Sequence, residues 1–494
     1  MVSVKIYLSG KIIKNWMTKL LEPILIDEPP FLPNEGKVTG EEKFLTPVFS
    51  LIASILARVS LGAAVFFIPF SYRFVLYELS IPEIYVDYTN GLLFVADIFL
   101  CATLVFWIVD LISRPRKLTL APLAISIPLF GLLLVSLVSV FVSIVPKISL
   151  YHFSRLLILT VLFVYLLNEL HDLKVILIPL AASTVIQSII SIIQVLKQKS
   201  IGLGLLGELL LDPAWSGVSI VYAQGVRTLR AYGLSDHPNI LGGCLAFSLV
   251  LLVSWQIMKK RETDGLRIAV ILIGMLGLLL TFSRSAWLAF ISGLGAVSLI
   301  LILTRRYREI IKLVNLGLAS LIALIPFVVY FAPLLGVRLN QANAFQEVEN
   351  ETRAIEERAA LNVAGNEIFV AHALTGVGVG TSPVAMKEQH PVFPYYYQPP
   401  HNTLLAAAAE TGIFGALFYG LLIFTPWLLI IVRRKKIQFN PAFVAATGAL
   451  LAVTVVGFFD YYTWLLAPGR FWQFLMWGAW GSFYGSSLKP ENND

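Results

Sequence analysis

Apolar residues in this chain fall into long stretches that are separated by short polar or basic connections. Stretches of about 17–25 apolar residues are long enough for an α-helix to cross a bilayer, so the pattern predicts an all-α, polytopic integral membrane protein with about 12 transmembrane helices. The expected helices lie at 47–70, 91–112, 119–145, 152–169, 174–195, 238–258, 266–282, 285–304, 312–333, 403–432, 441–460 and 464–486.

Basic residues are divided unevenly between the connections. Five alternate connections carry most of them: Arg114, Arg116 and Lys117; Lys174; Lys259, Lys260, Arg261 and Arg267; Arg305, Arg306, Arg308 and Lys312; Arg433, Arg434, Lys435 and Lys436. Because cytoplasmic loops retain Lys and Arg, the alternation places these connections and both termini on the cytoplasmic side of the inner (cytoplasmic) membrane. The net charge of +7 then reflects topology and does not indicate nucleic-acid binding.

The composition supports a membrane protein and little else. Hydrophobic residues make up 57% of the chain and charged residues 14%, which excludes an ordinary soluble domain. Residues 1–45 space lysines against Ile, Leu and Trp, which predicts an amphipathic helix on the inner leaflet followed by a polar linker. Residues 46–486 form the expected membrane domain, and 487–494 a cytoplasmic tail. The sequence has no HExxH or CxxC pattern, and we expect neither a metal nor a cofactor.

One predicted external connection, residues 334–401 between the ninth and tenth helices, is far longer than the others. A connection of this length is typical of a functional loop or an embedded subdomain. Within it, five apolar residues fall near one helical face: Ala360, Leu361, Ala364, Ile368 and Ala371. We expect a helix lying on or dipping into the outer leaflet.

The long connection ends in Pro399-Pro400-His401-Asn402, directly before the tenth apolar stretch. If Asn402 caps that helix, the free N–H groups of the first turn face the external site and disfavour an imidazolium. His401 would then be neutral, as a general base must be. The alternative is that His401 is an interfacial anchor and Asn402 only an N-cap.

Several arginines fall on the predicted external side, where the charge rule disfavours them. Arg230 precedes His237-Pro238-Asn239, Arg284 lies in the short turn TFSRSAW, and Arg353 and Arg358 lie in the long connection. Arginine near membrane depth is costly without an anionic partner. A pyrophosphate is one such partner, since a guanidinium fork binds phosphate oxygens bidentately. The alternative partner is a local carboxylate or a lipid headgroup.

Other polar residues have structural interpretations. Glu410 lies nine residues after His401, roughly opposite it on the helix, so we expect it to satisfy a partner on a neighbouring helix. Asp97 and Asp460 are candidate ion partners at the edges of spans. The aromatic tract 393–397 either stacks on sugar rings or forms an interfacial belt, and the sequence does not separate these alternatives.

Taken together, these motifs resemble the O-antigen ligase and O-antigen polymerase superfamily of bacterial membrane glycosyltransferases. His401-Asn402, nine residues, Gly412, two residues and Gly415 reproduce the ligase pattern His-Asn-x9-Gly-x-x-Gly. The arginine turn, Arg230 with the HPN segment, and Arg358 with His372 and LTGVG resemble further segments of the family. The chain departs from the family at Asn362, where Trp is frequent, and at Ala373, where Pro is frequent.

The resemblance implies an external active site under the long loop. The donor would be a glycan on undecaprenyl pyrophosphate, and the acceptor hydroxyl would belong to a glycan, a lipid or a protein. Transfer would invert the anomeric centre without a metal or a nucleotide sugar. His401 would activate the acceptor, and Arg230, Arg284 and Arg358, with Arg353 as a further candidate, would hold the pyrophosphate.

Two residues complete the expected substrate-binding set, His237 and Asn402. The main alternative function is a membrane transporter of small anions or glycans, which would also use external arginines and broken helices. A purely structural scaffold is a third possibility, but it gives no reason for His401-Asn402 or for the arginine turn.

Overall fold

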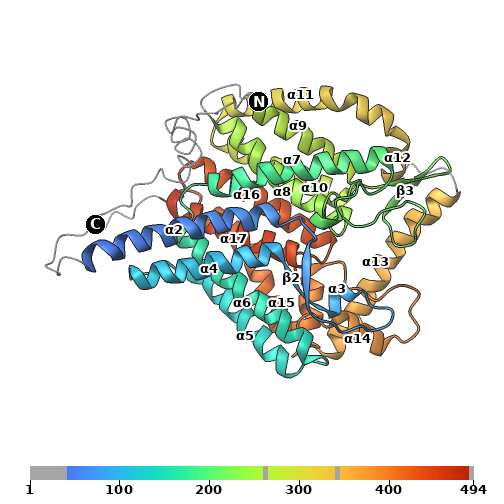
Figure 1. Ribbon diagram of the computed structural model, residues 1–494, viewed down its shortest axis with the longest axis horizontal. Coiled ribbons are helices and arrows are strands. Elements are labelled where there is room, and N and C mark those ends of the chain that lie inside the picture. Colours follow the sequence, from blue (N-terminus) through green and yellow to red (C-terminus); the bar gives the residue numbers. More distant parts are fainter. Residues whose placement is uncertain (1–41, 260–264, 340–344, 489–494) are drawn as a thin grey trace, which may run out of the picture.

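The computed structural model describes residues 42–259, 265–339 and 345–488, and almost all of its regular structure is helical (Figure 1). The helices are α2 (Glu42–Phe67), α3 (Val86–Thr89), α4 (Val95–Ser113), α5 (Leu123–Phe141), α6 (Pro146–Glu169), α7 (Lys174–Lys197), η1 (Gly204–Leu206), α8 (Pro238–Met258), α9 (Gly265–Leu280), α10 (Arg284–Leu303), α11 (Tyr307–Tyr330), α12 (Ala332–Arg338), α13 (Phe345–Ala371), α14 (Ser382–Gln389), α15 (Thr403–Val432), α16 (Pro441–Phe459) and α17 (Ala467–Ser487). Two short hairpins pair β1 (Arg73–Tyr77) with β2 (Gly91–Phe94) and β3 (Ile220–Ala223) with β4 (Val226–Leu229).

Each of the twelve predicted spans is occupied by a helix, and the predicted all-α membrane fold is confirmed. Within the described residues, ten helices are long and apolar enough to cross a membrane. The other two are α9, which has 16 residues, and α17, which has 21 residues of mixed aromatic and polar character. The protein is therefore a multi-pass membrane protein.

The centre of the bundle is α8. It is apolar on all sides, and 94% of its spanning window is buried among α7, α9, α10 and α16. By contrast, only 6% of the spanning window of α11 is buried, as expected of a helix that faces lipid. Small residues allow the closest packing: a side chain at Gly293 of α10 would meet the carbonyl oxygen of Gly448 on α16 at 2.8 Å.

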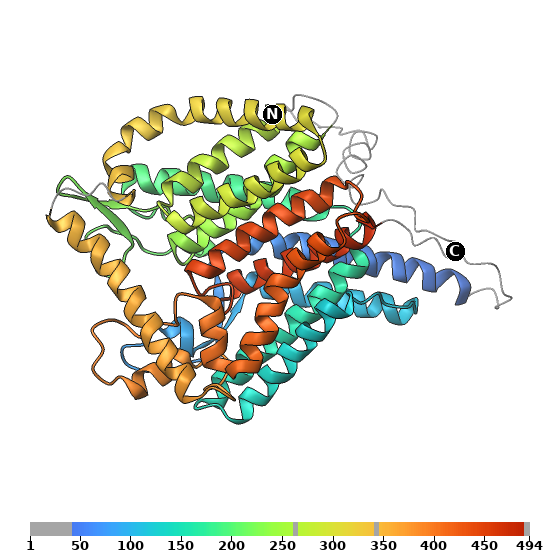
Figure 2. The same ribbon diagram turned by 180° about the vertical axis from the view of Figure 1, so that it is seen from behind.

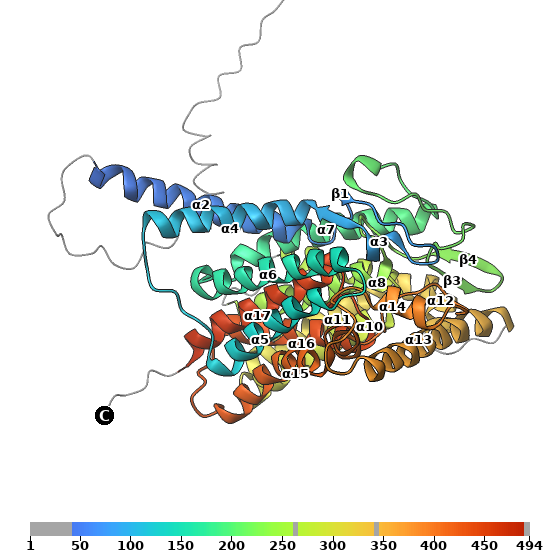
Figure 3. The same ribbon diagram turned by 90° about the horizontal axis from the view of Figure 1, so that it is seen from below.

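The two hairpins and the helices of the long connections gather at one end of the bundle. The hairpins, α3, α13 and α14 lie together at the right-hand end of Figure 1, and the view in Figure 3 confirms this grouping. Both hairpins are antiparallel, with Arg73 opposite Phe94 and Ile220 opposite Leu229. These elements occupy the connections that the charge alternation predicts to be external.

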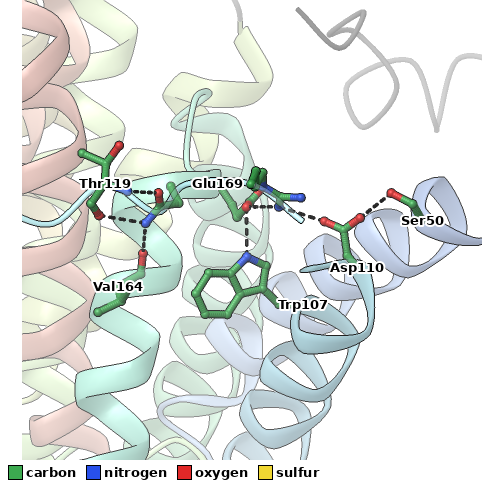
Figure 4. Close-up of polar contacts among 8 residues, drawn as sticks. Ser50, Trp107, Asp110, Thr119, Val164 and Glu169 are labelled. Carbon is green, nitrogen blue, oxygen red and sulfur yellow. Dashed lines mark hydrogen bonds and ion pairs between the residues drawn. The ribbon is translucent and has the colours of Figure 1, made fainter. Parts of the chain in front are cut away.

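At the opposite end, polar contacts around Asp110 and Glu169 join three helices (Figure 4). Arg116 donates to Asp110 of α4 at 2.8 Å and also to Glu169 of α6. Trp107 donates to the same Glu169 at 2.9 Å, and Ser50 of α2 donates to Asp110 at 2.5 Å. The arginine of this predicted cytoplasmic connection is thus neutralised within the protein.

The predicted long loop is largely helical, because it contains α12, α13 and α14. The predicted amphipathic face is confirmed for Leu361, Ala364 and Ile368, which are buried. That face packs against α14 and α15, and the position of α13 at the outer leaflet stays a prediction. Figure 2 shows α13 running diagonally across this end of the molecule. The predicted amphipathic segment at 1–45 and the tail at 487–494 lie almost wholly outside the described residues.

Candidate functional site at the external end of the bundle

A cavity of about 540 Å³ lies at the end of the bundle where the hairpins and α13 gather. Its lining comes from the predicted external connections and the helix ends beside them, and includes no residue of the five basic connections. Five of the sequence-predicted residues line this cavity together, although they are spread over about 170 positions of the chain: Arg230, His237, Arg284, Arg358 and His401.

Two sequence-predicted residues are not part of the lining. Arg353 is exposed on α13, one turn before Glu357, which does line the cavity. Asn402 is the N-cap of α15: its Oδ1 accepts hydrogen bonds from the N–H groups of Leu404 at 3.0 Å and Leu405 at 3.1 Å. The capping interpretation of Asn402 is confirmed, and its side chain fixes the start of the helix beside His401.

His401 is partly buried, and its ring meets that of Tyr461 edge to face at 4.9 Å between centroids. Within the described part of the chain, its buried Nδ1 has no hydrogen-bond partner. Burial is the main cause that lowers the pKa of His401 to about 4, with the charge of Asp460 opposing the shift and that of Arg358 adding to it. The imidazole is therefore neutral at pH 7 and has an unused polar atom.

The cause of this neutrality differs from the sequence-based expectation. We expected free N–H groups at the start of α15 to disfavour the imidazolium. The Asn402 side chain occupies two of those donors, so they do not face the cavity as free groups. Burial of the ring, and not the helix terminus, has the largest effect on the pKa of His401.

The glycines of the His-Asn-x9-Gly-x-x-Gly motif have a backbone role. α15 is interrupted at Gly412, whose φ of 70° is unfavourable for other residues. The interruption leaves the carbonyls of Ala409 and Glu410 to accept from Val377 at 3.1 Å and Gly378 at 2.9 Å. The glycine run 376–380 therefore docks against the kink, and this fastens the long connection to the helix that begins at His401.

Glu410 fulfils the structural role predicted for it. Its fully buried carboxylate accepts from the Gly380 N–H, the Ser382 hydroxyl and the Trp464 indole, each at 2.7 Å. Asp97 is likewise an ion partner, paired with Arg155 at 2.7 Å. Both carboxylates stabilise the helices around the cavity.

Arg230 is buried and bonded to neutral acceptors. Its guanidinium donates to the Thr281 carbonyl at 2.8 Å, the Ser219 hydroxyl at 2.8 Å and Asn239 Oδ1 at 2.5 Å. No carboxylate of the described residues forms an ion pair with it. Burial, reinforced by the charge of Arg338, lowers the pKa of Arg230 to about 9. Its positive charge is therefore not neutralised within this site.

The short arginine turn is held by two other arginines. Phe282 has a φ of 48°, and its carbonyl accepts from Arg338 at 3.0 Å, while the preceding Thr281 carbonyl accepts from Arg230. Arg284 begins α10 directly after this turn and lines the cavity. The turn thus brings the guanidinium groups of Arg230 and Arg338 to adjacent carbonyls and starts the helix that carries Arg284.

The HPN segment starts the central helix α8. His237 is its N-cap and accepts from the Asn239 N–H through Nδ1 at 3.1 Å, and Pro238 occupies the first turn. Burial is the largest cause that lowers the pKa of His237 well below its usual value, and Arg230 and Arg358 lower it further. His237 is a neutral capping residue in the cavity wall.

Several lining residues were not predicted as site residues. Asp460 forms an ion pair with Arg358, with 3.9 Å between Oδ2 and the guanidinium nitrogen, so the prediction that Asp460 is an ion partner is confirmed, but its place in the cavity was missed. The signal was available in Asp460-Tyr461-Tyr462, a polar triplet between two predicted spans. Arg338 had no such signal, because nothing in the sequence brings it to the distant turn at 281–284.

The fold and the cavity define a multi-pass α-helical membrane protein with a polar site, lined by arginines and carboxylates, at one end of its bundle. Residues 268–420 match the family model described as O-antigen ligase. This match confirms the resemblance to the O-antigen ligase superfamily that the motifs indicate. The match includes Arg284, Arg358 and His401 and covers less than half of the chain. No curated protein matches the chain.

Among the described residues, no three His, Cys, Asp or Glu side chains are grouped so as to hold a metal ion. The family supports a ligase or polymerase role in the synthesis of cell-envelope polysaccharide, with a lipid-linked glycan among its substrates.

Proposed function

We propose that this protein transfers a glycan from an undecaprenyl-pyrophosphate-linked donor to an acceptor hydroxyl at the external face of the cytoplasmic membrane. The transfer inverts the anomeric centre and needs neither a metal nor a nucleotide sugar. The observation that carries the proposal is the pairing of two features in one cavity: a neutral His401 with an unused Nδ1, and the four arginines Arg230, Arg284, Arg338 and Arg358.

In the proposed reaction, the acceptor oxygen forms a bond to the anomeric carbon as the bond from that carbon to the pyrophosphate oxygen breaks. The bonding electron pair leaves with the pyrophosphate, and the acceptor proton passes to the His401 imidazole. The pKa of about 4 makes this imidazole a weak base in the empty cavity. The negative charge of a bound pyrophosphate, together with Asp460, favours the imidazolium and so strengthens the base during transfer.

The arginines would have different roles in the reaction. Arg284 and Arg358 are the candidates for direct contact with the pyrophosphate, whose charge increases as the bond breaks. Arg230 and Arg338 donate hydrogen bonds to carbonyls of the turn that carries Arg284. They therefore position this turn and also contribute positive charge. Arg353 lies outside the cavity and acts at most through Glu357. Asn402 and His237 fix the helix starts at which His401 and the HPN segment lie.

The distribution of basic residues supports one orientation of the protein in the membrane. We place the lining of the cavity outside the cell and the five basic connections, with both termini, in the cytoplasm. Residues 46–486 form a single membrane domain in this proposal, with segments 1–45 and 487–494 on the cytoplasmic side.

A transporter of small anions or glycans is the alternative function. A transporter needs a site near the bilayer midplane that is reached from both sides. The described cavity is lined by the predicted external connections and the helix ends beside them, which favours the transferase.

Glycolipid analysis of a deletion strain tests the proposed function. Undecaprenyl-linked glycan should accumulate on the external leaflet, and the purified protein should transfer glycan from that material in vitro. Accumulation on the inner leaflet, with no transfer by the purified protein, would favour the transporter.

A further inference from the structure

The connection between α7 and β3 contains an apolar loop outside the membrane-spanning helices. Leucine dominates residues 201–211, which we name the leucine loop, and Glu208 is the one charged residue among them. Leu205, Leu206 and Leu210 are 93%, 50% and 77% exposed. The proposed reaction does not use these three leucines, because none of them lines the cavity. Large exposed apolar side chains that are grouped in this way mark an interaction surface.

The leucine loop folds back along the end of α7. Leu203 packs against a buried cluster that includes Ile190, and Glu208 accepts a hydrogen bond from the side chain of Gln194 at 2.8 Å. α7 ends at Lys197, so Gln194 lies about one turn and Ile190 about two turns before its end. A rise of about 1.5 Å per residue places Ile190 about 10 Å back from that end. Part of the loop therefore lies beside the spanning part of the helix and not beyond it.

The exposed side of α7 continues onto the leucine loop. Ile186, Ile189 and Leu196 are exposed and fall on one side of α7, opposite its buried polar residues. Since α7 is long and apolar enough to cross the membrane, its exposed apolar side faces the acyl chains of lipid. The leucine loop follows this helix directly and packs back against it, so its exposed leucines adjoin a surface that lipid covers.

Polar groups of the leucine loop are bonded within the protein. Glu208 is buried, and its carboxylate accepts from the backbone N–H groups of Ile201 at 2.7 Å and Leu203 at 2.6 Å. The Ser200 N–H donates to the Leu211 carbonyl at 3.2 Å, which closes the loop. A segment in contact with lipid needs such partners, because little water is there to supply them. The charged side chain thus points inward, and the outward surface is apolar.

The residues that flank the leucine loop are of types found at the polar edge of a membrane. Lys197 and Lys199 are exposed before the loop, and Trp215 is exposed after it. Lysine and tryptophan combine an apolar body with a polar tip, so they suit the level between acyl chains and water. The loop also contacts the segment that leads into β1 (Figure 3), and β1 itself exposes Phe74 and Val75.

We propose that the leucine loop is an interfacial anchor that inserts its leucine side chains between headgroups and acyl chains, in the leaflet at the cavity end of the bundle. The partner is lipid, because the exposed leucines adjoin the lipid-facing side of α7 and carry no hydrogen-bonding group. Gln194 also donates to the Gly233 carbonyl at 2.9 Å and accepts from its N–H at 2.8 Å. The anchor is therefore joined to the chain segment between Arg230 and His237, which is part of the cavity wall.

Spin labelling of the full chain tests the anchor. In a chain whose two native cysteines are replaced by serine, a nitroxide is attached to a cysteine at Leu205, at Ile189 on α7 or at the exposed Glu388 on α14. The protein is reconstituted in vesicles of phosphatidylethanolamine and phosphatidylglycerol. Oxygen concentrates in lipid and a polar nickel chelate in water, so the ratio of their relaxation effects reports the surroundings of each label.

We expect this ratio to be about fivefold or more higher at Leu205 than at Glu388, and to approach the ratio at Ile189. Leu210 is the second position, for use if the Leu205 variant does not fold. A ratio equal to that at Glu388 would show that the loop lies in water and would overturn the anchor. Protection of the loop from both reagents would also overturn it, because a protein surface and not lipid would then cover the leucines.

Photolabelling of the wild-type chain provides the second readout. Trypsin cleaves after Lys199 and Arg227, and residues 200–227 contain no other cleavage site before Arg227, so the leucine loop is released on one peptide. The vesicles carry a phosphatidylcholine with a diazirine in the upper part of one acyl chain, and mass spectrometry locates the adducts. Adducts should occur within 201–211 as well as on the lipid-facing side of α7. Adducts on α7 with none on the peptide 200–227 would overturn the anchor. Neither readout requires turnover, so both hold whether or not the protein is a transferase.

Discussion

The two ends of the helix bundle differ in whether carboxylates of the protein compensate the charge of an arginine. At the predicted cytoplasmic end, burial alone would lower the pKa of Arg116, but hydrogen bonds and charges of Glu169 and Asp110 outweigh it and raise that pKa. At the cavity end, burial lowers the pKa of Arg230 to about 9, and its three hydrogen bonds go to neutral acceptors. Carboxylates of the protein neutralise Arg116, whereas the hydrogen-bond acceptors of Arg230 are all neutral.

This difference separates structural arginines from candidate ligand-binding arginines in a chain with many basic residues. A compensated arginine such as Arg116 ties helices together and needs no ligand. Uncompensated positive charge at membrane depth is costly, and it persists where a ligand supplies the missing negative charge. The cavity end is therefore the part of the molecule that a pyrophosphate donor would complete.

The largest expected effect at the cavity end concerns His401. A sugar hydroxyl is a weak nucleophile, so loss of the base in His401→Ala should slow transfer by about 10²–10⁴-fold while the protein still inserts in the membrane. The measurement is product formation from purified lipid-linked donor at matched protein levels. His372 and His390 share the long connection but do not line the cavity, and their alanine variants should retain substantial activity.

His401→Gln sharpens this prediction, because glutamine keeps hydrogen-bonding capacity but cannot take the proton. It should fail nearly as badly as alanine. Near-wild-type turnover by His401→Gln would show that this residue positions a substrate and is not the base.

The next effect compares arginines of the two ends. Arg284→Lys and Arg358→Lys keep the charge but lose the guanidinium fork, and each should reduce transfer by about 10- to 100-fold. Arg116→Lys is the control and should leave the transfer rate of folded protein unchanged. Full activity of both cavity variants would reject bidentate binding of pyrophosphate.

A smaller effect is expected in the pH profile of kcat/KM, which reports the free enzyme. The base form of His401 is the neutral one, and its pKa is lowered to about 4. Activity should therefore be lost only as the pH falls through about 4–5, and should persist at pH 6, where an ordinary histidine is mostly protonated. A decline centred near pH 6.5 would show that His401 is solvated in the working enzyme.

Much of the fold could be predicted from the sequence, because apolar length and loop charge report directly on membrane topology. The site was predicted where a residue has a local signature: His401 at a helix start, or Arg284 in a short turn. Arg338, Tyr85 and Tyr88 were missed because only tertiary packing brings them to the cavity. The neutrality of His401 was predicted for the wrong reason, since the sequence shows a helix start but not the burial of the ring.

The comparison also depends on orientation, which thiol labelling tests without affecting activity. In a chain with Cys101 and Cys244 replaced by serine, a cysteine at Lys387 should react with an impermeant reagent in intact cells. A cysteine at Lys435 should not react until the cells are opened. The reverse pattern would place the cavity in the cytoplasm and remove the basis of the proposed reaction.

Photo-crosslinking of the donor tests the central claim most directly, because it reports where the pyrophosphate-linked glycan binds and needs no turnover. A photoreactive amino acid replaces Tyr222 in the cavity wall of one variant, and Leu118 in the basic connection at the other end of a second variant. We expect radiolabelled undecaprenyl-pyrophosphate-linked glycan to crosslink at position 222 and not at position 118. Crosslinking at position 118 with none at position 222 would contradict the account.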